Sequence, residues 1–100
     1  MVNFSGPPVV QIATTTGDLP TVGTGHMIKH AFQVERTMGS NAFTITVFGS
    51  LVSENGPWDS VATTSTNNDI LQIEGLYRFL KVNVGTLTAA EELTITYVGL

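Results

Sequence analysis

The stretch Phe43-Thr-Ile-Thr-Val-Phe-Gly-Ser-Leu51 alternates apolar and polar side chains almost residue by residue. Successive side chains of a β-strand point to opposite faces of the sheet, so this alternation is typical of a strand with one face in a core. Leu76–Val84 and Leu93–Gly99 alternate in the same way. The sequence therefore predicts an antiparallel β protein.

The remaining strands are predicted outward from that stretch. Met27–Arg36 also alternates, and Gly39-Ser-Asn41 provides a turn, so we expect a hairpin between Met27–Arg36 and the stretch 43–51. Trp58–Thr63 and Ile70–Glu74 are shorter candidates. Turn signals recur every 8–12 residues, which favours a β-sandwich of about seven to eight strands. The predicted fold class is all-β: an antiparallel, jelly-roll-like β-sandwich.

The first 25 residues differ from the rest because Gly and Pro interrupt them every few positions. Only Val9–Ala13 indicates a short strand, and Thr14–Gly25 has the composition of a loop. We therefore expect an irregular N-terminal arm with a short first strand over residues 1–25. Residues 26–100 form the sandwich, and the whole chain is one domain.

The alternation also assigns side chains to the core or to the surface. In Met27–Arg36, one face carries Ile28, His30, Phe32 and Val34. The side chains expected to face inward are Phe43, Ile45, Val47, Leu51, Leu76, Leu80, Val82, Val84, Leu93, Ile95 and Tyr97. The outer faces then carry three aromatic rings, which a free monomer seldom displays together. We expect an interface made of Phe48, Tyr77, Phe79, Val9, Val10 and Ile12.

Composition narrows the range of functions. The chain has 100 residues, a net charge of −4, only four Lys and Arg, and no Cys. Few basic residues argue against nucleic-acid binding, and the lack of Cys excludes disulfides and thiolate sites. No stretch reaches the ~20 apolar residues of a membrane span. With 12% charged residues, little electrostatic repulsion opposes association, so we expect copies of the chain or a partner to cover its surface.

Residues for catalysis or metal binding do not gather in the sequence. His26 and His30 are four apart, and in a strand that spacing separates them by roughly 13 Å, too far for one metal ion. A buried His30 instead needs a hydrogen-bond partner. No Gly-x-Ser-x-Gly motif occurs, and nothing brings two of the carboxylates together. We expect no enzymatic activity, no metal site and no cofactor.

Two loop features leave alternatives open. Trp58 follows the turn Asn55-Gly56-Pro57 and is either a residue that closes one end of the core, which we favour, or a ring that stacks on a sugar. Asn67-Asn-Asp69 and Glu54 carry oxygens that suit calcium, although calcium loops usually place acidic residues more densely. In a saccharide-binding protein, Trp58 and Asn67 would be the contact residues.

Three segments, Ile45–Trp58, Gly75–Thr88 and Leu93–Val98, resemble the small β-sandwich proteins of tailed-bacteriophage virions. The order of strand, Gly-Ser, Asn-Gly, Trp and then Tyr77-Arg-Phe-Leu-Lys-Val82 is also similar to the galactose-binding, discoidin-like jelly roll. Sugar-binding relatives carry basic residues in their loops, which this chain lacks. Residues 1–25 resemble no family.

The resemblance implies a structural virion protein, assembled in the host cytoplasm, that decorates or cements the capsid. Its implied partners are copies of itself, with a trimer favoured, and the major capsid protein or another virion protein. The alternative is a tail or fibre accessory module that binds carbohydrate on the host surface.

Overall fold

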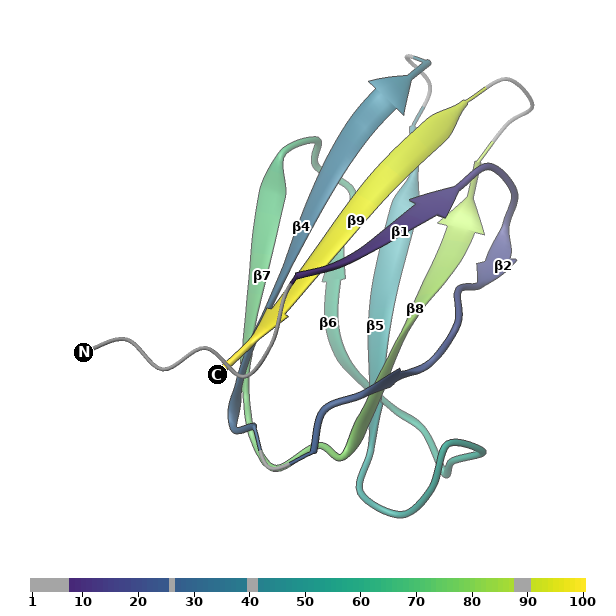
Figure 1. The fold of residues 1–100 in the computed structure, drawn as a ribbon. Coiled ribbons are helices and arrows are strands. Elements are labelled where there is room, and N and C mark those ends of the chain that lie inside the picture. The colour runs from purple at the N-terminus through teal and green to yellow at the C-terminus, as the bar shows by residue number, and fades with distance from the viewer. Residues whose placement is uncertain (1–7, 26, 40–41, 88–90) are drawn as a thin grey trace.

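The computed structural model describes residues 8–25, 27–39, 42–87 and 91–100, and these residues build a β-sandwich without helices (Figure 1). The described residues form nine strands. They are β1 (Val9–Ala13), β2 (Gly17–Asp18), β3 (Val22–Gly23), β4 (Lys29–Met38), β5 (Thr44–Ser50), β6 (Asp59–Thr64), β7 (Asp69–Glu74), β8 (Phe79–Thr86) and β9 (Glu92–Gly99).

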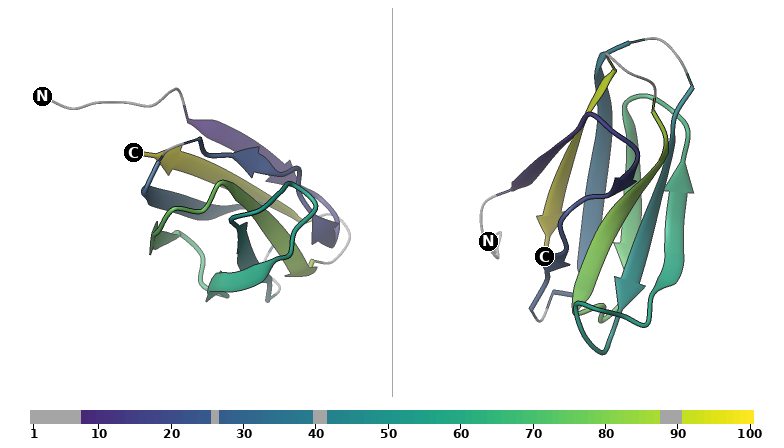
Figure 2. Two further views of the ribbon diagram at one scale, coloured as in Figure 1. Left: turned by 90° about the horizontal axis from the view of Figure 1, so that it is seen from below. Right: turned by 90° about the vertical axis from the view of Figure 1, so that its right-hand side faces the viewer.

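The strands lie in two antiparallel sheets that face each other (Figures 1 and 2). We call the sheet with the order β1-β9-β4-β7 sheet A, and the sheet with the order β2-β8-β5-β6, in which β3 also pairs with β8, sheet B. Strands that are distant in sequence are therefore neighbours, and the chain changes sheets several times. The predicted all-β antiparallel sandwich is confirmed.

The core lies between the sheets and follows the predicted alternation. Nine of the eleven side chains expected inside are buried: Phe43, Ile45, Val47, Leu80, Val82, Val84, Leu93, Ile95 and Tyr97. His30, Phe32 and Val34, which share one face of β4, are buried as well. Each strand contributes alternate residues, because a strand in a two-layer sandwich has one face on the core and one face outside.

The predicted hairpin between residues 27–36 and 43–51 is wrong. β4 pairs with β7 and β9 in sheet A, whereas β5 pairs with β6 and β8 in sheet B. The connection after Met38 therefore crosses from one sheet to the other. A short turn-rich link is compatible with a hairpin within one sheet and with a crossover between two sheets. The sequence pattern did not distinguish the two, and the hairpin was the wrong choice.

Two side chains expected in the core, Leu51 and Leu76, are exposed, and so is Ile28, which was expected on one face with His30 and Phe32. Each lies just outside a strand, since β4 begins at Lys29, β5 ends at Ser50, and β8 begins at Phe79. The apolar alternation in the sequence runs past the ends of the strands, and beyond those ends the rule of opposite faces no longer applies.

The N-terminal segment belongs to both sheets over the part that the structure describes. β1 pairs along its whole length with β9, and β2 and β3 each pair with β8. Gln11 Nε2 also donates to the Pro20 carbonyl, 2.8 Å away. Thr14–Gly25, which we expected to be a loop, thus contains two two-residue strands, while residues 1–7 lie outside the described residues.

Candidate functional site

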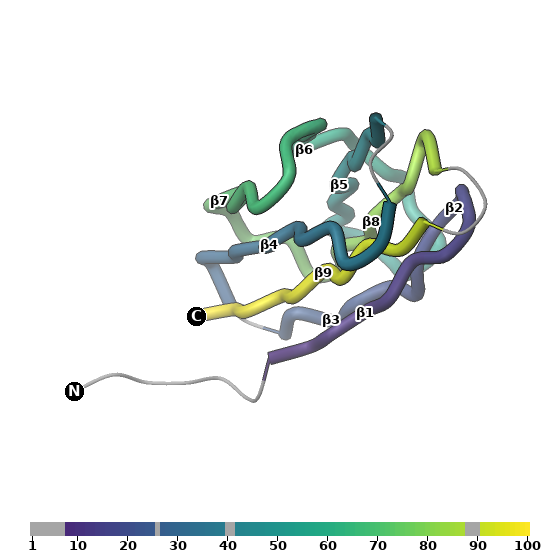
Figure 3. Tube along the Cα trace, turned by 90° about the horizontal axis from the view of Figure 1, so that it is seen from above, coloured from purple at the N-terminus to yellow at the C-terminus, as the bar shows by residue number. Residues whose placement is uncertain are grey.

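The first candidate surface is the outer side of β1, at one edge of sheet A (Figure 3). Gln11 and Ala13 turn inward, so Val10 and Ile12 turn outward and are 58% and 59% exposed. Val9 is also exposed. The three β1 residues predicted to form an interface thus lie on a strand that ends its sheet, with Val10 and Ile12 on the outer face and Val9 on the same face as Gln11.

The same face of sheet A continues from β1 across β9 and β4. Val10 lies opposite Thr96, and Ile12 lies opposite Thr94. Threonine side chains are short, so the two apolar side chains of β1 stand above the neighbouring strand. The result is a surface with an apolar border on β1, next to the threonines of β9 and, one strand further, Glu35 of β4.

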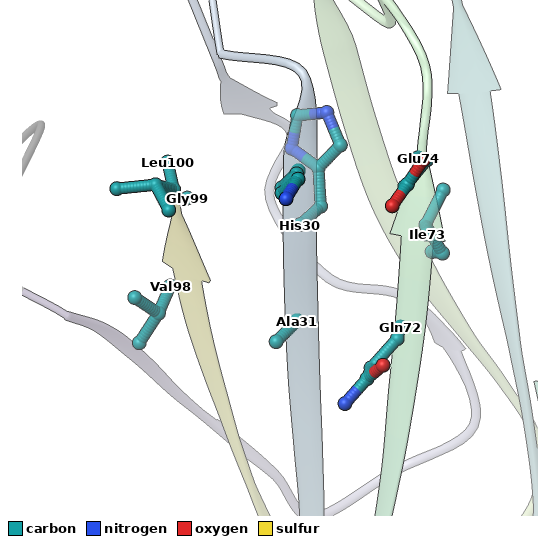
Figure 4. Close-up of a pocket in the computed structure, with 9 residues that line it drawn as sticks. His30, Ala31, Gln72, Ile73, Glu74, Val98, Gly99 and Leu100 are labelled. Carbon is teal, nitrogen blue, oxygen red and sulfur yellow. The ribbon is translucent and has the colours of Figure 1, made fainter.

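An open hollow of about 340 Å³ lies further along this face, between β9, β4 and β7 (Figure 4). Ala31 forms its floor because its methyl group is short, and Val98 and Gln72 are its direct neighbours on the two adjacent strands. Lys29 pairs with Glu74 in register at one end. The charge there is balanced, and Val98 contributes apolar surface.

Exposed apolar side chains continue past the end of the hollow. The Ile28 N–H donates to the Leu100 carbonyl, and the Gly75 N–H donates to the Ile28 carbonyl, so these three backbones lie side by side. Ile28, Leu100 and the adjacent Leu76 are all exposed, Leu76 by 66%. The sequence pattern did not indicate this end patch, because its alternation placed Leu76 in the core.

The second candidate surface is the outer face of sheet B, where a lysine covers two aromatic rings. Lys81 lies opposite Phe48 in the strand register. Its Nζ lies 5.8 Å from the centroid of the Phe48 ring and 4.6 Å from the centroid of the Trp58 ring. Both distances suit cation–π attraction. Phe48 is therefore half-buried rather than bare, and its ring is held beneath a side chain of its own sheet.

An acidic group completes this cluster. Lys81 Nζ lies 2.9 Å from Asp18 Oδ2, and Asn83 Nδ2 donates to Asp18 Oδ1 at 2.8 Å. The hydrogen bonds from Asn83 and Lys81 lower the pKa of the Asp18 carboxyl below its ordinary value of 3.8. The two-residue strand β2 thus places Asp18 where it neutralises the lysine.

The other two predicted interface aromatics separate. Phe79 lies opposite Ser50 and is half-buried on the outer side of sheet B. Tyr77 precedes β8, and its ring packs against the hydrophobic core. A Cβ added to Gly49 would lie 2.6 Å from the Tyr77 ring, so the missing side chain makes room for it. The expectation that Tyr77 lies on the outer face is therefore wrong.

Trp58 and Asn67 lie at opposite ends of β6, which begins after Trp58 and ends before Asn67. Trp58 is half-buried against Lys81 outside the core cluster, so it does not close the core as we favoured. Asn67 Oδ1 accepts a hydrogen bond from the Arg36 N–H at 2.8 Å. A strand of this length spans roughly 20 Å, so one sugar ring cannot contact both residues.

His30 forms a buried polar network with Tyr97. Its Nε2 lies 3.1 Å from the Gly75 carbonyl oxygen, which can only accept, so Nε2 carries the proton and donates. The Tyr97 hydroxyl then donates to Nδ1 at 2.8 Å. His30 therefore has the hydrogen-bond partner that the sequence predicted for a buried histidine. Burial raises the pKa of Tyr97 to about 12.

The described residues hold neither a metal-binding cluster nor a membrane-spanning helix. Among them, no group of three or more His, Cys, Asp and Glu side chains is arranged to hold a metal ion. His26, four residues before His30, lies outside the described part of the chain. The same residues contain no helix with the length and apolarity to cross a membrane.

Comparisons with known proteins identify the fold. No protein-family model matches the chain, and no curated protein sequence does. The SPBc2 prophage-derived protein YomS superposes with a TM-score of 0.65 at 13% identity, covering 95% of this chain and 96% of that one. The Yersinia pseudotuberculosis-derived mitogen superposes with a TM-score of 0.62 at 11% identity, covering 92% and 85%. At these identities the likeness shows a shared β-sandwich fold.

Proposed function

We propose that this chain is a non-enzymatic structural protein of a tailed-bacteriophage particle, which decorates or cements the capsid as a homo-oligomer. One observation carries the proposal. Sheet A keeps large apolar side chains in solvent along its β1 border and at its end, although its opposite face fills a complete core. The exposed residues are Val10, Ile12, Ile28, Leu76, Val98 and Leu100.

Such a surface suits a protein that works attached to others. Burying apolar area yields about 25 cal/mol for each Å², and a decoration protein repeats this gain at every copy on the shell. The surface charge opposes close contact only weakly, since 12% of the residues are charged and Lys81 forms an ion pair with Asp18. Flat faces of this kind can lie over the seams between shell subunits.

The phage context rests on two further supports. The segments 45–58, 75–88 and 93–98 resemble small virion sandwich proteins, and one protein with the same fold is prophage-derived. Neither support specifies the head or the tail. We place the chain on the head because exposed apolar side chains along one border and one end of sheet A, rather than an enclosed ligand cleft, are what the described residues present.

Immunogold electron microscopy of purified particles tests this function. The particles come from the phage or prophage that encodes the chain, and the antibody is raised against the folded protein. We expect many gold labels over the head, together with a copy number comparable to that of the major capsid protein by quantitative mass spectrometry. Unlabelled particles that contain no peptide of the chain would contradict the proposal.

The alternative is a tail or fibre module that binds carbohydrate, and the position of Trp58 is what favours it. Its ring is half-buried on an outer face close to Phe48, a common setting for sugar stacking. Lys81, however, already occupies one side of that ring. A glycan array with the wild type and Trp58→Ala separates the two functions. Specific binding that Trp58→Ala abolishes, together with gold labels confined to the tail, would support the alternative.

A further inference from the structure

The two sheets have four edges, and natural sheets protect their edges against pairing with another chain. The β6 edge is protected by a bulge, because Val47 pairs with Ala62 while the next residue, Phe48, pairs with Ser60. The opposite edge of sheet B consists of β2 and β3, which have two residues each and are separated by Pro20. Short strands, bulges and prolines all prevent edge-to-edge pairing.

The two edges of sheet A differ from one another. β7 begins with Asp69 and ends with Glu74, so it has a carboxylate at each end. β1 has the sequence VVQIA, with no charge, no Pro and no Gly. Its five residues pair with β9 without a register shift, so the strand is regular over its whole length. Within the described part of the chain β1 pairs with β9 alone, and its other side carries unpaired N–H and C=O groups.

The sequence of β1 is complementary to itself. Gln11 is the middle residue of the strand, so an antiparallel partner centred there overlaps all five positions. Val10 then lies opposite Ile12 of the second copy, and Ile12 lies opposite its Val10. Both side chains point outward and are more than half exposed, so each apolar side chain gains an apolar cross-strand neighbour.

We propose that β1 pairs with β1 of a second copy about a two-fold axis through Gln11, which joins the two A sheets into one eight-stranded sheet. This inference rests on the proposed homo-oligomer and specifies how it forms. The axis is perpendicular to the sheet, so the outer faces of both copies, each with its hollow, lie on the same side. A closed two-fold contact yields a dimer in place of the trimer that the sequence favoured.

The surroundings of β1 allow this contact. Figures 2 and 3 show β1 as the outermost strand on its side of the molecule, with no strand beyond it. The Gln11 side chain is held back toward Pro20 by its hydrogen bond, which keeps it away from the outward side of the strand. The paired strands would bring Val10 and Ile12 of both copies together at the centre of a doubled outer face.

Engineered cysteines test the register, because the chain has no cysteine of its own. Opposite residues in antiparallel strands have Cβ atoms about 4.5–5.5 Å apart, close to the separation that a disulfide needs. Mixing Val10→Cys with Ile12→Cys and oxidising mildly should give a disulfide-linked dimer at a yield at least tenfold above either variant alone. Mixing Val10→Cys with Ile70→Cys is the matched control, since Ile70 is 52% exposed on the opposite edge of the same sheet.

A charge placed in the proposed contact between the two β1 strands, the β1 seam, tests the association itself. We expect Ile12→Lys to weaken self-association at least tenfold in sedimentation equilibrium, and Ile70→Lys to leave it unchanged. Unaltered thermal unfolding of both variants shows that they fold. Equal effects of the two lysines, equal cross-linking in all mixtures, or a trimer mass would overturn the β1 pairing.

The outcomes distinguish this inference from the function on which it rests. Labelled phage heads combined with no β1 cross-link would refute the β1 seam and leave the virion function intact. A specific cross-link in solution combined with particles that lack the chain would refute the virion function and support the seam.

Discussion

Replacing Tyr97 with Phe tests the buried hydrogen-bond network that joins Tyr97 of β9 to His30 of β4 and to the Gly75 carbonyl. The hydroxyl of Tyr97 donates to His30 Nδ1 at 2.8 Å, and His30 Nε2 donates to the Gly75 carbonyl at 3.1 Å. Every buried side-chain nitrogen and oxygen of the described residues has a partner. Tyr97→Phe removes one oxygen and leaves His30 Nδ1 as a buried acceptor with no donor.

The expected loss follows from that orphaned acceptor. A buried polar group without its partner destabilises a protein by about 1–3 kcal/mol. A domain of this size has a free energy of unfolding of roughly 5–15 kcal/mol, so the loss is a substantial fraction of the total. It corresponds to a drop in Tm of roughly 4–8 °C for each kcal/mol. The ring centroids of Tyr97 and Phe32 lie 4.9 Å apart. The ring of the introduced phenylalanine fills the same space, so a change in packing contributes little to the loss of stability.

Urea unfolding measures this loss, followed by circular dichroism and by the fluorescence of Trp58. The matched control is Tyr77→Phe, because no hydrogen bond of the Tyr77 hydroxyl is present in the described part of the chain. We expect the midpoint to fall for Tyr97→Phe with an unchanged m-value, and to stay within about 0.5 kcal/mol of the wild type for Tyr77→Phe.

A double-mutant cycle then isolates the contact. His30→Leu alone and Tyr97→Phe alone should each destabilise the protein, while the double variant should lose less than the sum, with a coupling energy of about 0.5–3 kcal/mol. If Tyr97→Phe matched Tyr77→Phe in stability, or if the two changes were additive, the reasoning about the network would be refuted.

Three further predictions concern pH and close packing. Burial raises the pKa of Tyr97 from 10.0 to about 12, so stability should hold below pH 10 and fall as the pH rises through 12, in step with a late phenolate absorbance change. The pKa of Asp18 is lowered in the folded state, so its ionised carboxylate stabilises the fold above pH 3.8. Asp18→Asn should therefore lower the free energy of unfolding by at most about 1 kcal/mol at neutral pH. In urea unfolding, the difference between this variant and the wild type should vanish as the pH falls below the lowered pKa. Gly49→Ala should lose about 1–3 kcal/mol, because its Cβ would lie 2.6 Å from the Tyr77 ring. Gly85→Ala, whose nearest contact is 3.6 Å, is its control and should be neutral or stabilising; equal Tm values for these two alanine variants would contradict the packing argument.

The sequence predicted which side chains of each strand face the core. Ile45 and Val47, like Leu80 and Val82, are buried, because period-2 alternation directly encodes which side chains meet in the core. The same logic failed at Leu76, which follows the pattern but lies before the start of β8. Alternation states which residues share a face only while the backbone remains extended.

The pairing of the strands could not be read in the same way. β4 and β5 are consecutive and joined by a turn-rich link, yet they lie in different sheets. Alternation is the same for a hairpin and for a crossover between layers, so the choice depends on which partners complete the core. β2 and β3 were missed because two-residue strands contain too few positions to show any period.

The candidate surfaces were predicted in part. Val10 and Ile12 are exposed together on an edge strand, as an interface requires. The position of Tyr77 depends on space left by Gly49, which is distant in sequence, and no local pattern indicates it. The same is true of Lys81, whose contacts with Phe48 and Trp58 depend on the register of β5 with β8 and on the course of the chain before β6.

Sedimentation equilibrium of the wild-type chain is the most direct test of the central claim. That claim is that sheet A, with its exposed β1 border, is an assembly surface. The chain has a mass of 10.7 kDa, and we predict a reversible shift to twice that mass as the protein concentration rises. The shift should be lost in Ile12→Lys and kept in Ile70→Lys. A mass of 10.7 kDa at every concentration, for the wild type as well as for both variants, would contradict the account.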